Sequence, residues 1–152
     1  MNDRIRFLAL SELFNNISPA DLADIETLLT EVSLPKDTQI FSEDDIGDNM
    51  YLLSRGSVKI TIRMVWRKEE EEWISIIRPG EIFGEFSFID GAKRSASAWT
   101  MEDSSALVLS RADFDRYSLE KPSVALAVMH NFAWLLTRKV RSTTLLYRNA
   151  KH

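Results

Sequence analysis

Between about residues 38 and 110 the chain consists of short apolar runs, and residues that favour turns stand between them. Gly, Pro, Asp and Asn interrupt the runs before they reach the length of an ordinary helix, so the pattern is typical of short strands. The predicted strands are Gln39–Phe41, Met50–Leu53, Val58–Val65, Trp73–Ile77, Ser95–Thr100 and Ala106–Leu109. Short strands joined by regular turns predict an antiparallel β-roll or sandwich.

Helical patterns precede these strands. Apolar residues recur at helical spacing within Arg4–Asn15, which predicts a short amphipathic helix. Ser18 then resembles an N-cap with Pro19 in the first turn, and this predicts a second helix that ends before Pro35. The face that we expect the second helix to bury consists of Leu22, Ile25, Leu28, Leu29 and Val32.

Helical patterns also follow the strands. Ser110 and Asp113 have the spacing of a capping box, with Asp in the place of Glu. Pro122 suits a helix start, and residues 124–147 contain neither Gly nor Pro. In this last helix apolar side chains recur at Leu126, Met129, Phe132, Ala133, Leu136, Val140 and Leu146. A long terminal helix with a broad apolar face is typical of one that needs a partner surface.

The order of these elements predicts an α+β fold in a single domain, residues 1–152. We expect N-terminal helices over about residues 3–33, an antiparallel β-roll of the double-stranded β-helix or jelly-roll type over about 34–110, and C-terminal helices over about 111–149. The charged run Arg67–Glu72 lies between two Trp residues. We interpret it as the solvated tip of a hairpin, and the alternative is an acidic recognition patch.

The composition narrows the classes of function. Asp and Glu number 23 against 19 Lys and Arg, a net charge of −4, whereas a nucleic-acid-binding domain usually has a basic footprint. The chain has no Cys and two His, which argues against disulfides, thiolate metal sites and His-rich metal centres. Its apolar runs are too short for a membrane span, and its first residues do not resemble a secretory signal. We therefore expect a cytoplasmic protein that binds neither membranes nor nucleic acid.

The segment Arg78–Ser97 carries the most specific chemistry. Gly84 allows backbone to approach a ligand closely, and residues 85–89 can form one helical turn whose free N–H groups favour an anion. Arg94, at the start of the next strand, can donate two parallel hydrogen bonds to a phosphate. The carboxylate of Glu85 suits a sugar hydroxyl instead. The two side chains can therefore bind different parts of one nucleotide: Arg94 binds the phosphate and Glu85 binds the ribose.

The stretch FGEFSFIDGAKRSAS, residues 83–97, resembles the phosphate-binding cassette of the cyclic-nucleotide-binding domain family. That family, which includes the catabolite activator protein and the regulatory subunits of protein kinase A, has F-G-E, then apolar, small and apolar residues, a short loop and R-[small]-A. Every one of these positions is filled here, and the pattern at Asp48–Val58 matches as well. The resemblance extends from about Leu10 to Tyr147. One departure is Glu43-Asp44, in a turn where the family usually has Gly; Asp tolerates a left-handed conformation better than most residues.

The resemblance implies a role for each matching residue. Arg94 and the backbone N–H of Ser95 bind the cyclic phosphate, Glu85 accepts from the ribose 2′-hydroxyl, and the residues around Glu85 present backbone groups. In the activator protein the long helix contacts the base. Matching Arg138-Lys139-Val140 to that helix places Thr143 and Thr144 at the base; the alternative is that both lie on an exposed helix face. The predicted binding residues are Gly84, Glu85, Phe86, Ser87, Arg94, Ser95, Thr143 and Thr144.

Other side chains have simpler interpretations. We expect three cassette side chains to pack in the core rather than to stack on a base: Phe83, Phe86 and Phe88. His130 is predicted to be a packing residue rather than a ligand. Trp134 is predicted to lie in the core or at a dimer contact. Lys139 is long enough to reach the phosphate region, but we interpret it as a solvated side chain.

The function that we predict is a non-enzymatic receptor for a cyclic nucleotide, with cAMP favoured over cGMP and with no cofactor or metal. Binding is expected to reposition the terminal helix, which can contact the base while the roll holds the phosphate. We also expect a homodimer through the same helix, and an output by contact with a downstream protein that the sequence does not identify.

Three alternatives compete with this receptor. The first is the ligand-sensing half of a transcription regulator of the catabolite-activator class, although no room for a helix-turn-helix follows the long helix before His152. The second is a metal-dependent enzyme on a β-roll, which needs clustered His and carboxylates, whereas both His lie outside the strands. The third is a degenerate module that binds only protein, which would have no use for Glu85 and Arg94.

Overall fold

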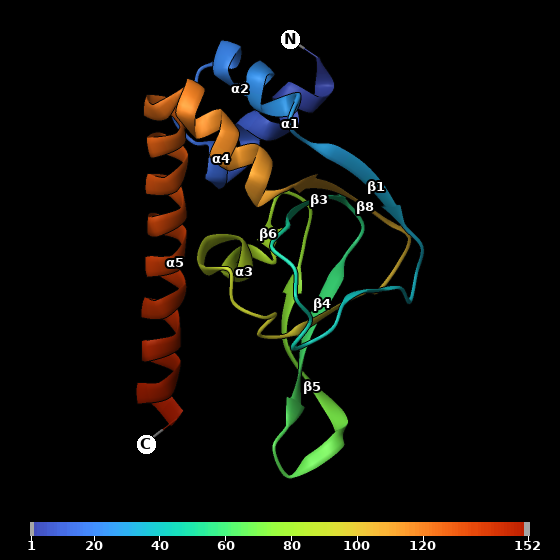
Figure 1. The fold of residues 1–152 in the computed structure, drawn as a ribbon. Coiled ribbons are helices and arrows are strands. Elements are labelled where there is room, and N and C mark those ends of the chain that lie inside the picture. Colours follow the sequence, from blue (N-terminus) through green and yellow to red (C-terminus); the bar gives the residue numbers. More distant parts are fainter. Residues whose placement is uncertain (1, 151–152) are drawn as a thin grey trace.

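The computed structural model describes residues 2–150, without the side chains of residues 67–69. Its elements follow the order helices, strands, helices (Figure 1). The N-terminal helices are α1 (Asp3–Leu10), the 3₁₀ helix η1 (Glu12–Phe14) and α2 (Pro19–Glu26), and the C-terminal ones are α4 (Arg111–Glu120) and α5 (Pro122–Ala150). The strands are β1 (Thr30–Leu34), β2 (Gln39–Phe41), β3 (Met50–Arg55), β4 (Val58–Met64), β5 (Arg67–Ile77), β6 (Ile82–Phe83), β7 (Ser97–Thr100) and β8 (Ser104–Leu109), with the short helix α3 (Glu85–Asp90) between β6 and β7.

The strands form two four-stranded antiparallel sheets, in the orders β1-β8-β3-β6 and β2-β7-β4-β5. Leu52 of β3 lies opposite Leu107 of β8, and Ile60 of β4 lies opposite Ala98 of β7. The N-terminal helices and α4 gather at one end of the roll, and α5 runs along its side with α3 between them (Figure 1). The predicted α+β fold, an antiparallel roll flanked by N-terminal helices and a long C-terminal helix, is confirmed.

Two groups of buried apolar side chains make up the core. The larger one joins the helices to the first sheet and includes Phe88 of α3. The smaller one lies inside the roll and consists of Leu53, Val58, Ile77, Phe83 and Ala98. Because Phe83 and Phe88 belong to different groups, the cassette (residues 83–97) connects both parts of the core.

Local signals that the sequence predicted are present at three places. The Oγ of Ser18 accepts from the N–H of Asp21 at 3.2 Å, and the Oγ of Ser110 accepts from that of Asp113 at 3.1 Å. Each cap satisfies an N–H that its helix leaves free. Asp44 has a φ of 72°, so the turn without the expected Gly does adopt the left-handed conformation.

The second helix is shorter than predicted. α2 ends at Glu26, and Leu28 and Leu29 lie between α2 and β1. Val32 belongs to β1, where it pairs with Ala106 of β8. Apolar residues at this spacing fit either a further helical turn or a turn followed by a strand. Pairing with β8 favours the strand conformation for these residues. Because β8 is distant in the sequence, the local pattern does not report this pairing.

The first predicted helix, Arg4–Asn15, is two helices. Ser11 is extended, with φ −77° and ψ 133°, and it separates α1 from η1. Its buried hydroxyl donates to the carbonyl of Gly80 at 3.4 Å, which ties the N-terminal helices to the loop before β6. A contact with a residue so far along the chain leaves no local trace in the helical spacing.

The β4–β5 hairpin is longer than predicted. Its turn lies at Val65 and Trp66, so the run Arg67–Glu72 follows the turn as the first part of β5 instead of forming it. Residues 70–72 are exposed, so the predicted solvation of this end of the hairpin is confirmed for them. β5 is an edge strand, and carboxylates such as Glu72 can therefore stay in water within it. Two short strands, β1 and β6, were not predicted, and β7 begins at Ser97 rather than Ser95.

The two halves of α5 differ in burial. The first half buries Ala125, Val128, Phe132 and Leu135, whereas residues 137–150 are all exposed.

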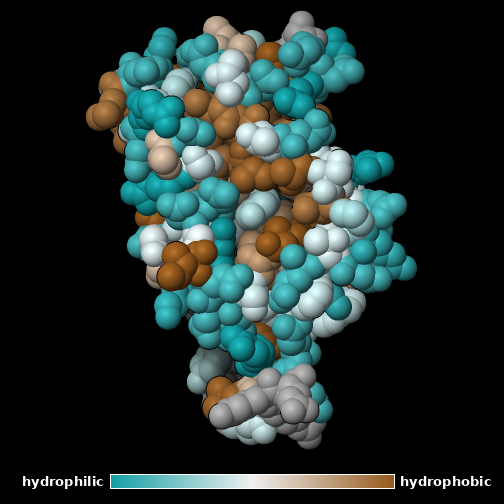
Figure 2. Space-filling model, turned by 45° about the vertical axis from the view of Figure 1, so that its right-hand side comes forward, coloured by the Kyte–Doolittle hydropathy of each residue, from teal (hydrophilic) through white to brown (hydrophobic). Residues whose placement is uncertain are grey.

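The face of the molecule in Figure 2 is mostly hydrophilic around an apolar region near its middle. Among the described residues, none of the helices combines the length and the hydropathy that crossing a membrane requires.

Candidate functional site

The cassette folds as a tight turn, a short helix and an extended return. Gly84, with φ 75°, is the N-cap of α3, and Gly91, with φ 70°, is its C-cap. Both lie in the left-handed region, which a residue without Cβ occupies readily. The N–H of Gly91 donates to the carbonyl of Ser87 at 2.9 Å and ends the helix. The chain therefore reverses direction within a few residues of β6.

Gly84 also occupies a place without room for a side chain. A Cβ there would lie 3.0 Å from Nη1 of Arg94, 3.2 Å from the carbonyl oxygen of Asn49 and 3.3 Å from Cδ2 of Tyr51. At Gly47, a Cβ would lie 3.3 Å from Nη2 of the same arginine. Two glycines thus bring backbone close to the guanidinium of Arg94.

Arg94 is held from inside the fold and is 4% exposed. Its Nη1 donates to the carbonyl of Gly84 at 2.9 Å, and its Nη2 donates to that of Asn49 at 2.8 Å. Burial lowers the pKa of the Arg94 guanidinium, against the opposing influence of Tyr51 and neighbouring carboxylates. None of the ion pairs found among the described residues includes Arg94. The site therefore holds a buried positive charge whose hydrogen bonds go to neutral carbonyls.

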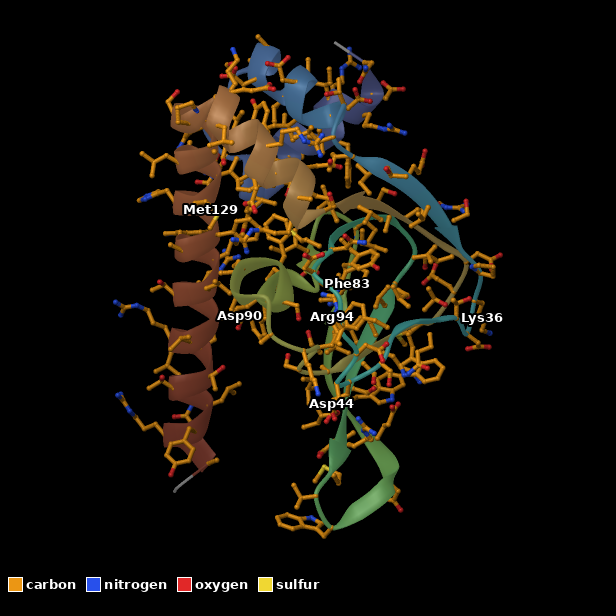
Figure 3. The ribbon with its side chains drawn as sticks, in the orientation of Figure 1. Lys36, Asp44, Phe83, Asp90, Arg94 and Met129 are labelled. Carbon is orange, nitrogen blue, oxygen red and sulfur yellow. The ribbon has the colours of Figure 1, made fainter. Side chains whose placement is uncertain are left out.

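Aromatic rings lie beneath this charge. The Cζ of Arg94 lies 4.4 Å from the ring centroid of Phe41. Tyr51 stacks on Phe83, with centroids 5.0 Å apart, and Phe41 lies 5.9 and 6.2 Å from these two rings. Figure 3 shows Arg94 and Phe83 beside each other, inside the roll next to α3. A guanidinium over an aromatic face is favourable, so Phe41 stabilises the charge of Arg94.

Glu85, the first residue of α3, is 5% exposed and bonded to α5. The Nζ of Lys139 lies 2.6 Å from its Oε1, and the same ammonium lies 6.0 Å from the ring centroid of Phe86. The interpretation of Lys139 as a solvated side chain is therefore incomplete: half of the side chain is exposed, but its ammonium is paired with Glu85. An unpaired carboxylate at this depth would be costly, and Lys139 supplies its partner.

These groups line a pocket of about 500 Å³ between the roll, α3 and α5. Its floor and walls contain Phe41, Ile60, Ile74, Ser75, Ile77, Ile82, Phe83, Gly84, Glu85, Phe86, Ser87, Arg94, Ser95, Ala96, Arg138, Lys139, Ser142 and Thr143. The charged groups come from the cassette and α5, whereas β4 and β5 contribute mainly apolar side chains. The pocket thus combines a buried cation, a carboxylate and an apolar wall, which suits a small anion with a flat apolar part.

The structure brings together all the predicted binding residues except Thr144. Thr143 lines the pocket, and its hydroxyl donates to the carbonyl of Lys139 at 3.0 Å. The hydroxyl of Thr144 donates to the carbonyl of Val140 at 3.0 Å, outside the lining. The roles of these residues in binding stay predictions.

Sequence reasoning missed further lining residues on α5. Arg138 and Ser142 line the pocket beside Lys139 and Thr143. The four form two pairs with a spacing of four residues, which places them on one face of a helix, and this signal was available in the sequence. Arg138 is held by Glu12 of η1, whose hydrogen bond raises the pKa of the arginine.

The three Phe predictions have different outcomes. Phe83 and Phe88 are buried, as predicted, but Phe86 is 49% exposed and lines the pocket, so the prediction that it packs in the core is wrong.

Trp134 is 54% exposed, under the guanidinium of Arg138, so it does not lie in the core. His130 is exposed, and its prediction as a packing residue is wrong. In the part of the chain that the structure describes, no group of three or more His, Cys, Asp or Glu side chains is placed to hold a metal.

Comparison with known proteins gives consistent matches over this region. The family model described as the cyclic nucleotide-binding domain matches residues 31–120. The cyclic AMP receptor protein of Thermus thermophilus is 33% identical over 135 residues, which cover 89% of this chain and 60% of that protein. A CRP-like cAMP-activated global transcriptional regulator of Mycobacterium tuberculosis is 27% identical over 136 residues, which cover 90% of this chain and 58% of the regulator. The chain thus spans about three fifths of the length of these two relatives.

Solved structures have the same fold. The catabolite activator protein of Thermus thermophilus superposes with a TM-score of 0.81 at 31% identity, covering 91% of this chain and 62% of that one. A cyclic nucleotide-binding domain from Methylobacillus flagellatus also has a TM-score of 0.81, at 26% identity, covering 91% of this chain and 76% of that one. The matched residues 31–120 include the whole cassette.

Proposed function

Because the chain belongs to the cyclic nucleotide-binding domain family, we propose that it is a receptor for a cyclic nucleotide, with cAMP preferred over cGMP. The observation that carries this proposal is the guanidinium of Arg94. It is a buried positive charge on the wall of a pocket of about 500 Å³, and none of the ion pairs among the described residues includes it. A buried charge is unfavourable unless it is paired, so an anion that fits the pocket is its expected partner.

The chemistry of the lining supports the following orientation of the nucleotide. The cyclic phosphate binds Arg94, which has five N–H donors and uses two of them on Gly84 and Asn49. The ribose 2′-hydroxyl donates to Glu85. The base lies toward α5, near Thr143. The full set of proposed binding residues is Gly84, Glu85, Phe86, Ser87, Arg94, Ser95, Thr143 and Thr144.

The preference for cAMP is supported by the relatives and by α5. A cyclic AMP receptor protein and a cAMP-activated regulator cover most of this chain, although a cGMP-dependent protein kinase is also 28% identical over 117 residues. Thr143 offers a hydroxyl beside the place of the base. Ser95 is compatible with either nucleotide.

The proposed output is a movement of α5, not a reaction. The pocket is lined from both the roll and α5, so a bound nucleotide favours the helix position in which both sides contact it. The second half of α5 is exposed and carries apolar side chains at Val140, Leu145 and Leu146, which suit a homodimer. We place this receptor in the cytoplasm, and its downstream partner is another protein.

A second candidate function is the ligand-sensing part of a transcription regulator. It is favoured by the match to about three fifths of each of two such relatives. In that case the movement of α5 would act on a DNA-binding part of the same protein. A degenerate module that binds only protein is the third candidate, and the paired Glu85 and buried Arg94 argue against it.

Thermal unfolding with added cAMP, cGMP or cyclic di-GMP tests the receptor. A ligand at a hundred times its dissociation constant stabilises the native state by about 2.7 kcal/mol. For a chain of this length the expected rise in Tm is roughly 5–10 °C. We expect the largest rise with cAMP. Arg94→Ala and Arg94→Lys should lose it, because Lys keeps the charge but not the planar pair of donors.

Lys93→Ala is the matched control, because Lys93 is an exposed neighbour of Arg94 and does not line the pocket. It should retain the full ligand-induced rise. Each variant is compared with its own ligand-free Tm, since losing Arg94 also changes basal stability. No rise with any nucleotide, in wild-type protein freed of carried-over ligand, would refute the receptor and favour the protein-binding module.

A further inference from the structure

The ion pair between Glu85 and Lys139 joins two elements that are far apart in the sequence. Oε1 of Glu85 lies 2.6 Å from Nζ of Lys139, and the carboxylate side chain is 6% exposed against 51% for the lysine. Glu85 is the first residue of α3, whereas Lys139 lies in the exposed half of α5. The pair therefore connects the proposed ribose acceptor to the helix that is proposed to move.

Two opposite roles are possible for such a lysine. Lys139 could occupy the acceptor in place of the ribose, so that a nucleotide must expel it. Alternatively, it could stay on Oε1 while the other oxygen accepts the 2′-hydroxyl. A carboxylate has lone pairs for several donors on its two oxygens, so hydrogen-bonding capacity allows both. The charge of the complete site decides between the two roles.

The charged groups that line the pocket are Arg94, Glu85, Lys139 and Arg138. Arg138 is already paired with Glu12. A cyclic phosphate adds one negative charge, which Arg94 balances. If Lys139 left, the carboxylate of Glu85 and the phosphate would share one guanidinium in the same pocket. Like charges that close together are unfavourable, so the balance favours a lysine that stays.

We propose that Lys139 remains bonded to Glu85 in the nucleotide complex and is a positioning residue for the ribose site. It holds Oε1, cancels the charge of a carboxylate that lies near the phosphate, and leaves Oε2 for the 2′-hydroxyl. Because Lys139 belongs to α5, the same bond ties the position of that helix to an occupied pocket. This inference rests on the proposed function and names the residue through which the ribose site reaches α5.

The test compares dissociation constants for cAMP, measured by isothermal titration calorimetry on the full chain. Lys139→Met should weaken binding about tenfold or more, the usual effect of losing a hydrogen bond to a charged group. Lys139→Arg should recover most of the affinity. The matched control is Arg141→Met, which removes one positive charge from an exposed position of the same helix that does not line the pocket. It should change binding by less than about twofold.

A double-mutant cycle with Glu85→Gln separates positioning from a general charge effect. Lys139 acts through the charge of Glu85, so Lys139→Met should have little further effect in the Glu85→Gln background. Circular dichroism and thermal unfolding without ligand check that each variant is folded.

Three results would overturn the inference while wild-type protein still binds cAMP. Tighter or unchanged binding by Lys139→Met would identify the lysine as a competitor or a bystander. An equal loss in Arg141→Met would indicate a diffuse charge effect. An undiminished loss in the Glu85→Gln background would show that Lys139 acts elsewhere. If wild-type protein binds no cyclic nucleotide, the proposed function itself fails and the positioning role fails with it.

Discussion

The ring of Phe88 in α3 stacks on the ring of Phe132 in α5, with centroids 5.7 Å apart and planes inclined by 28°. Both side chains are 1% exposed. Phe88 also meets the edge of Phe114 in α4, at 5.6 Å. The cassette helix is therefore packed against both C-terminal helices, and a shift of α3 that keeps this packing must be shared by α5.

Phe132→Ala should destabilise the protein by about 3–5 kcal/mol, because it leaves a cavity under α3 and α5. Phe132→Leu should cost less than half of that loss. Urea unfolding followed by circular dichroism measures both. Phe86→Ala is the comparison. Because Phe86 is 49% exposed, this substitution should lower the free energy of unfolding much less than Phe132→Ala does. Equal losses for Phe86 and Phe132 would contradict the packing described here.

Gly84→Ala and Gly91→Ala separate backbone strain from crowding. The two glycines have similar φ values, 75° and 70°, so alanine carries the same strain of about 1–2 kcal/mol at each. A Cβ at Gly91 meets nothing within 4 Å, whereas at Gly84 it lies 3.0 Å from Arg94. We expect Gly84→Ala to be more destabilising by about 1–3 kcal/mol, as measured by urea unfolding, and to weaken nucleotide binding. Identical losses would mean that Arg94 moves aside without cost.

Tyr117→Phe should leave stability unchanged or raise it by about 1 kcal/mol. The Tyr117 hydroxyl is buried and has no hydrogen-bond partner among the described residues. Burial, together with Asp24, Asp21 and Glu120, raises the pKa of Tyr117 above its ordinary value of 10.0. Stability linked to this group is complete below pH 10.0 and is lost as the pH rises through the raised pKa. Urea unfolding across that alkaline range should therefore show a smaller loss for Tyr117→Phe than for wild type, and a larger loss would contradict this.

Leu146→Glu should dissociate the proposed homodimer, because it places a charge among the exposed apolar side chains of the second half of α5. Leu146 is 70% exposed in the single chain. Sedimentation velocity on wild type and variant measures the association state. Leu119→Glu is the control, since Leu119 is 86% exposed but belongs to α4. A monomeric wild-type protein, or a dimer that tolerates Leu146→Glu, would refute an interface on this part of α5.

Local sequence signals were reliable where the interaction that they report is itself local. The caps at Ser18 and Ser110 bond to N–H groups three residues away, and both were predictable. Asp44 adopts its left-handed turn within a few residues of chain. The end of α2 at Glu26 was not predictable in this way, because the residues that follow are held as a strand by β8.

The sequence by itself determined the order of helices and strands and the spacing of Glu85 and Arg94 in the cassette, because periodicity, turns and motif spacing are properties of neighbouring residues. Only the tertiary structure decided which side of α5 meets the cassette. It brought Lys139 to Glu85 across 54 positions of the chain, placed Thr143 in the pocket lining and left Thr144 outside it. The physical reason is that helix packing, through rings such as Phe88 and Phe132, sets the rotation and height of α5 against the roll. No residue of α5 carries that information alone.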